Sequence, residues 1–100
     1  MIRAAFKKDL SGFTVSGHSG YAEAGSDIVC AAASSMTILV CNAIEALGGD
    51  AEVEQNEKEA SVSLTLRVPN ENASRLIAVL YDEFRELEDQ HPKYVRVQKI

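Results

Sequence analysis

The chain is poor in several residue types that build special sites. Its 100 residues include two cysteines, two histidines, two prolines and no tryptophan. Cys30 and Cys41 lie eleven positions apart in one apolar segment; in a helix that spacing is about 16 Å, beyond the reach of a disulfide. No C-x-x-C pair occurs, so a structural zinc site would lack ligands. We expect neither a metal nor another cofactor.

Positive charge is also scarce. Lysine and arginine total 10 against 15 aspartates and glutamates, which gives a formal net charge of -5. Because binding to a phosphate backbone depends on basic side chains that release counterions, we expect no direct contact with nucleic acid. The acidic surface instead favours encounter with a basic partner.

Targeting signals are not apparent in the sequence. The first residues contain no long apolar run followed by a small-residue cleavage site, so we predict no secretory signal. Together with the free cysteines, this favours a cytoplasmic, reducing location. Residues 28–47 have about the length of a membrane span. The run is interrupted, however, by Ser34, Ser35, Thr37, Asn42 and Glu45. We therefore predict a buried helix there and no contact with a membrane.

The first half of the chain predicts a hairpin followed by a long helix. Residues 2–8 and 13–16 alternate around a polar turn, as the strands of a β-hairpin do. Apolar residues surround most of the helix at 28–47, so it needs cover on two sides. The sheet is expected to provide one side, and the second helix or another subunit the other. Gly48 and Gly49 end the helix.

The second half repeats strands and a helix in the same order. Residues 51–55 and 61–68 predict a second hairpin, and Asn70 or Asn72 opens a helix with one apolar stripe. Residues 94–97 give a last short strand. The length favours a single domain over residues 1–100. We thus predict an α+β fold in the order β-β-α-β-β-α-β, with two helices on a mostly antiparallel sheet.

A glycine-bearing segment, residues 17–27, separates His18 from Cys30. If Ser26 or Asp27 caps the following helix, Cys30 falls in its first turn, where the amides and the helix dipole favour a thiolate. An imidazole that accepts the thiol proton and a thiolate that attacks a carbonyl are the minimum for thiol catalysis.

The amides of Cys30 and Ala31 are candidates to hold the oxyanion of such a reaction. Spacing alone also fits a simpler interpretation, in which Cys30 is a buried small hydrophobe and His18 ends a strand, because free cysteines are commonly buried. Cys41 is expected to pack in the core, and His91 to lie at a solvated helix end.

The string GHSGYA at residues 17–22, followed by GSDIVCAAAS at residues 25–34, resembles the signature of the Prp family of ribosomal-processing cysteine proteases. The resemblance implies an endopeptidase that removes a short, basic N-terminal extension from a large-subunit ribosomal protein, the one numbered twenty-seven. On the matching positions, the resemblance implies that His18 is the general base, Cys30 the nucleophile, and Asp27 and Ser34 supporting residues. The resemblance and the two-sided apolar helix together suggest a homodimer.

The supporting roles remain open at this point. Asp27 either caps the helix or orients the catalytic pair, and Ser34, at i+4 from Cys30, shares its helix face. Residues 19–26 are expected to form a flexible loop that moves to admit a peptide. Its named members are Ser19, Gly20, Tyr21, Gly25 and Ser26. Tyr21 either stacks on substrate or pins the loop to the surface.

Two other classes of function compete with a protease. A non-catalytic ribosome-assembly module would use the segment between His18 and Cys30 only as a recognition loop. A thiol-dependent acyl transferase would pass an acyl group from Cys30 to an amine rather than to water.

Overall fold

The computed structural model describes residues 1–23 and 25–100. The chain forms the predicted order of elements: β1 (Ile2–Phe6), β2 (Gly12–Ser16), α1 (Ile28–Ala46), β3 (Ala51–Asn56), β4 (Ser61–Leu66), α2 (Glu71–Gln90) and β5 (Val95–Lys99). The α+β fold class is confirmed.

The five strands form one sheet in the order β3-β4-β2-β1-β5. The pairs β3–β4, β4–β2 and β2–β1 are antiparallel. β1 and β5 are parallel, with Ile2 opposite Val95. This parallel pair arises because the connection from α2 returns β5 alongside the first strand. The sheet is therefore mostly antiparallel, as predicted.

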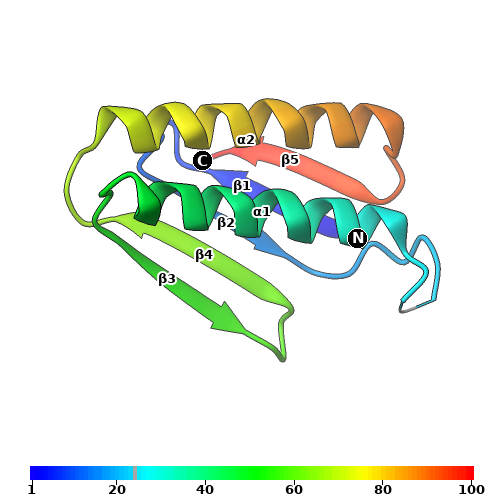
Figure 1. Cartoon of the computed structure of the whole chain (residues 1–100). Helices are drawn as coiled ribbons and strands as arrows, with labels where there is room; N and C mark the ends of the chain where they lie inside the picture. The colour runs from blue at the N-terminus through cyan, green and yellow to red at the C-terminus, as the bar shows by residue number, and fades with distance from the viewer. Residues whose placement is uncertain (24) are drawn as a thin grey trace.

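The molecule has two layers, with α1 and α2 side by side and antiparallel on one face of the sheet (Figure 1). The covered face carries the core. In β1, Ile2, Ala4 and Phe6 are buried at alternate positions, as expected for a strand with one covered face. The open face is polar, and there the hydroxyls of Thr14 and Ser63 lie 2.9 Å apart.

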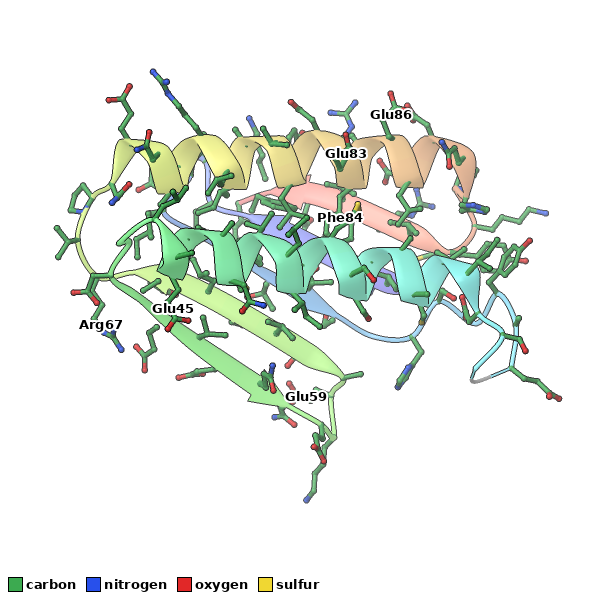
Figure 2. All side chains as sticks on the ribbon, in the orientation of Figure 1. Glu45, Glu59, Arg67, Glu83, Phe84 and Glu86 are labelled. Atoms are coloured by element: carbon green, nitrogen blue, oxygen red, sulfur yellow. The ribbon has the colours of Figure 1, made fainter. Side chains whose placement is uncertain are left out.

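α2 is amphipathic in the way that its sequence predicts. Asn70 is the N-cap and accepts the amide of Ala73. Phe84 is fully buried and lies 6.1 Å, ring centroid to centroid, from Phe6. Figure 2 shows Phe84 pointing toward the sheet while Glu83 projects to the outer side of the helix. Packing this single stripe fixes α2 over β1 and β5.

α1 is long and apolar enough to cross a membrane by length and composition, yet one side of it packs into the core. Its buried residues are Val29, Ala33, Thr37, Val40 and Ile44. The other side is open, since Ile38 is 50% and Leu39 is 68% exposed. The prediction of a buried helix is confirmed for the inner side, and the outer side is exposed in the single chain, where the sheet and α2 do not cover it.

The expected irregular segment runs from the end of β2 to the start of α1. It lies at the end of the molecule where α1 begins and α2 ends (Figure 1). Gly20 and Gly25 both have positive φ, +72° and +89°. Ala24 belongs to the predicted flexible loop and lies outside the described residues. The fold thus places this loop beside the first turn of α1.

Candidate active site

A surface hollow at the start of α1 contains both predicted catalytic residues. It is lined by His18, Gly20, Ala22, Gly25, Asp27, Cys30, Ala31 and Ser34. Cys30 comes from the first turn of the helix and is half-buried, whereas His18 is exposed on the segment that leaves β2. Residues twelve positions apart in the chain therefore share one solvent-accessible space.

The thiol of Cys30 has a hydrogen-bond partner other than the imidazole. The main-chain N–H of Ser19 donates to its sulfur over 3.3 Å. Among the hydrogen bonds of the described residues, none joins His18 to Cys30. The structure thus brings the two side chains to one hollow without closing the contact between them.

A tight turn fixes the point at which His18 leaves the sheet. Gly17 has φ +90°, and a Cβ there would clash with the carbonyl oxygen of Met1. The nitrogen of Met1 in turn donates to the carbonyl of His18. Because only glycine fits this close approach in the left-handed region, Gly17 determines where the imidazole enters the hollow.

Asp27 is the N-cap of α1. Its Oδ1 accepts the amide of Cys30 over 2.9 Å, and its Oδ2 accepts the hydroxyl of Ser19 and the amide of Ala22. The Ser19 hydroxyl and the Cys30 amide are the main reasons that the pKa of Asp27 falls from 3.8 to about 2. Asp27 is therefore a capping anion, and its hydrogen bonds are made to the loop and helix rather than to His18.

The hydrogen bonds at the start of α1 also involve the two amides that were predicted to hold an oxyanion. The amide of Cys30 is bonded to the Asp27 side chain, and the amide of Ala31 donates to the Asp27 carbonyl over 3.0 Å. Both N–H groups are already engaged in starting the helix, so the prediction that they hold an oxyanion is wrong for this conformation.

Ser34 lies one turn beyond Cys30, as predicted, and is exposed. It lines the hollow that contains His18. It also lines an apolar cavity of about 90 Å³ that Cys30 borders as well and whose wall includes Ile2, Val15 and Val62. Cys30 and Ser34 thus line both the open hollow and the small apolar cavity.

The loop contains one residue whose position the sequence does not reveal. Ser19, predicted as part of the flexible segment, is 3% exposed and bonds to both Asp27 and Cys30. A serine in a glycine-rich string is typical of a solvated turn, so composition carries no signal for this burial.

Tyr21 pins the loop to the body of the protein. Its ring meets those of His91 and Tyr94 edge-on, with centroids 5.4 Å and 5.3 Å away. This contact agrees with the pinning alternative for Tyr21. His91 is half-buried at the C-cap of α2 rather than fully solvated.

The second thiol has a different environment. Cys41 is half-buried beside Ile44 and Val53, and this burial raises the pKa of the thiol. Both cysteines are free. Within residues 1–23 and 25–100, no three His, Cys, Asp or Glu side chains gather in a way that could hold a metal ion.

Comparison with protein families identifies a family that covers almost the whole chain. The model of the family described as cysteine protease Prp matches residues 1–96. A search of curated protein sequences finds no match.

Solved structures share the whole fold. The ribosomal processing protease Prp from S. aureus, with a covalently linked product peptide, superposes with a TM-score of 0.90 at 21% identity, covering 100% of both chains. The same protease with a substrate peptide gives 0.81 at 18% identity, covering 99% of this chain and 97% of the other. A Streptococcus mutans protein gives 0.82 at 24% identity, covering 100% and 94%.

Proposed function

The chain belongs to the cysteine protease Prp family, and on that premise we propose that it is an endopeptidase that uses Cys30 as nucleophile and His18 as general base. The observation that carries this proposal is the shared hollow at the start of α1, into which both residues are built. Asp27 and Ser34 act as supporting residues, Asp27 through the helix cap and Ser34 through the wall of the site.

In the proposed reaction, the imidazole of His18 accepts the Cys30 proton and the sulfur attacks the carbonyl carbon of the scissile bond. The C–N bond then breaks, the imidazolium protonates the leaving amine, and water hydrolyses the thioester. Because the imidazole and the sulfur are not hydrogen-bonded to each other in this structure, we expect substrate binding to bring them together, which fits a loop that adjusts as the peptide enters.

The proposed substrate is the basic N-terminal extension of a large-subunit ribosomal protein. The net charge of -5 and the exposed Glu23 of the loop favour a basic segment. The apolar cavity beside Cys30 suits an apolar side chain near the cut. We place the activity in the cytoplasm, where reducing conditions keep a catalytic thiol free.

Cleavage of a peptide that spans the extension junction tests the proposal. Cys30→Ala and His18→Ala should each abolish cleavage while the far-UV circular dichroism and thermal unfolding stay close to those of the wild type. Cys41→Ala is the matched control, since it removes the other thiol and should cut normally. Cleavage that survives Cys30→Ala would contradict the assignment of the nucleophile.

The competing function is a non-catalytic ribosome-assembly binding module. A wild-type protein that binds the peptide but never cuts it would favour the module. Transfer of the peptide acyl group to an added amine in preference to water, seen in the product masses, would indicate an acyl transferase instead.

A homodimer through the outer side of α1 is part of the proposal. Ile38 and Leu39 are exposed there, and apolar patches of this kind are typical of protein interfaces. Leu39→Glu should shift the mass measured by light scattering from dimer to monomer. Val79→Glu, at a 55% exposed site on α2, should leave it unchanged. A wild type that is monomeric at high concentration would contradict this part.

A further inference from the structure

Ser19 is an inward-facing residue in an outward-facing loop. It is 3% exposed, whereas its neighbours His18, Gly20, Tyr21 and Ala22 are all exposed. A hydroxyl is costly to bury unless it is hydrogen-bonded. The hydrogen bonds of Ser19 therefore indicate the role of this buried residue.

The polar atoms of Ser19 contact three parts of the site. Its main-chain N–H donates to the sulfur of Cys30 over 3.3 Å. Its hydroxyl donates to Oδ2 of Asp27, and its Oγ accepts the main-chain N–H of Tyr21 over 3.1 Å. One residue thus links the thiol, the helix cap and the loop.

We propose that Ser19 is a positioning residue: the hydroxyl, anchored on Asp27, holds the Ser19 main chain so that its N–H points at the sulfur of Cys30. The inference rests on the proposed protease function for its role in catalysis. Ser19 lines neither the hollow that contains His18 nor the apolar cavity beside Cys30. It therefore acts through Cys30 rather than through contact with substrate.

Electrostatics explain why such a donor is useful at this position. A hydrogen bond donated to sulfur favours the thiolate over the thiol, whereas a nearby carboxylate disfavours it. Asp27 brings a negative charge next to Cys30 because it caps the same turn. The Ser19 hydroxyl binds that carboxylate and the Ser19 amide binds the sulfur. Both contacts therefore oppose the unfavourable interaction between the Asp27 carboxylate and a thiolate at Cys30. His18 is the other titratable group of the hollow.

Site-resolved alkylation with iodoacetamide tests the inference without any substrate. The rate at Cys30 is measured by peptide mass spectrometry at pH 7 and at the alkaline plateau, where differences in ionisation vanish and only access remains. In Ser19→Ala the ratio of these rates should fall about two- to tenfold, the effect of one hydrogen bond. Cys41, in the same samples, is the internal reference and should not change.

Matched variants separate positioning from folding. Ser26→Ala makes the same change at an exposed site of the same loop and should keep the wild-type ratio. Ser19→Gly removes the hydroxyl by a second route and should reproduce the fall if Ser19→Ala proves unstable. Ser19→Thr restores a hydroxyl and should recover most of the ratio. An unchanged ratio in folded Ser19→Ala or Ser19→Gly would overturn the inference.

Peptide cleavage gives the second readout. Because Ser19 does not line the substrate spaces, its loss should lower kcat by about two- to tenfold and leave KM within about twofold. An equal rise in KM with unchanged kcat would overturn the positioning role. If the alkylation ratio falls as expected but the wild type never cleaves, the protease function fails while the contact between Ser19 and Cys30 stands.

Discussion

The two helices start with the same hydrogen bond and differ in what surrounds it. Asp27 accepts the amide of Cys30 over 2.9 Å, and Asn70 accepts the amide of Ala73 over 2.9 Å. Cys30 and Ala73 therefore occupy equivalent positions, three residues after the cap. Ala73 is 2% exposed in the core, whereas Cys30 is half-buried and faces a hollow.

The additional hydrogen bonds at the start of α1 indicate a function beyond helix capping. Asn70 serves the start of α2, and capping accounts for it in full. Asp27 meets the same need and also receives a hydroxyl from Ser19 and an amide from Ala22. Helix formation does not require these extra donors. They tie the loop to Asp27, which lies three residues before the proposed nucleophile, Cys30.

The outer faces of the two helices also differ, and again α1 has the feature that the fold does not require. On α2, Glu83 and Glu86 project outward and Phe84 points inward (Figure 2), as a two-layer fold needs. On α1, Leu39 is 68% exposed. Packing within the chain explains neither the arrangement of the first turn of α1 nor the exposure of its outer face. We assign the first turn to catalysis and the outer face to self-association.

Removing each cap gives the largest contrast. Asp27→Ala should lower kcat/KM for the peptide by at least about tenfold, because it releases Ser19 as well as the helix start. Asn70→Ala should cost about 1 kcal/mol of unfolding free energy and leave cleavage intact. Denaturant unfolding and peptide cleavage measure the two effects. Equal loss of activity in both variants would show that the caps matter only through stability.

The second largest expected effect is the loss of stability caused by a larger side chain at Ala73, the position in α2 equivalent to Cys30. Ala73→Leu should cost about 1–3 kcal/mol, since extra methylenes do not fit a closely packed interior. Ala46→Leu, at an exposed site near the end of α1, is the control and should change stability by less than about 0.5 kcal/mol. Urea denaturation compares them. A tolerated Ala73→Leu would mean that this end of α2 is loosely packed.

The charge of Asp27 predicts a smaller, pH-dependent effect. Its pKa is about 2 in the folded protein and 3.8 in the reference state. A lowered pKa stabilises the fold above the unfolded value, and that contribution is lost as the pH falls from about 4 to about 2. The stability difference between the wild type and Asp27→Asn should therefore change across this window.

Urea midpoints at pH 5, 4, 3 and 2 measure this dependence. Asp82→Asn, which alters one carboxylate on the exposed side of α2, controls for the change in net charge. A difference between wild type and Asp27→Asn that stays constant with pH would contradict the bonding of the ionised carboxylate to Ser19 and Cys30.

Local periodicity predicted most of the fold. Alternation in residues 61–68 and the stripe that includes Phe84 identify their elements because one face of each is buried. The order of the strands in the sheet is harder to predict from the sequence, since β5 reaches its parallel place beside β1 only through the packing of α2. The sequence does not decide what covers the outer side of α1, because an apolar helix has the same pattern whether its cover comes from within the chain or from a partner.

The candidate site divides in a similar way. His18 and Cys30 are candidates on residue type, spacing and the family resemblance, and residue type offers Ser26 or Asp27 as the cap, of which the structure uses Asp27. The inward turn of Ser19 and the use of the Cys30 and Ala31 amides by the cap depend on three-dimensional geometry. No residue-level pattern encodes that geometry.

The most direct test of the central claim correlates alkylation of each thiol with activity. Wild-type protein is treated with iodoacetamide for increasing times, and each sample is divided between peptide cleavage and site-resolved mass spectrometry. We predict that activity falls in direct proportion to the alkylated fraction of Cys30, reaches zero when that site is fully modified, and does not depend on Cys41. Activity that persists after complete modification of Cys30 would contradict the account.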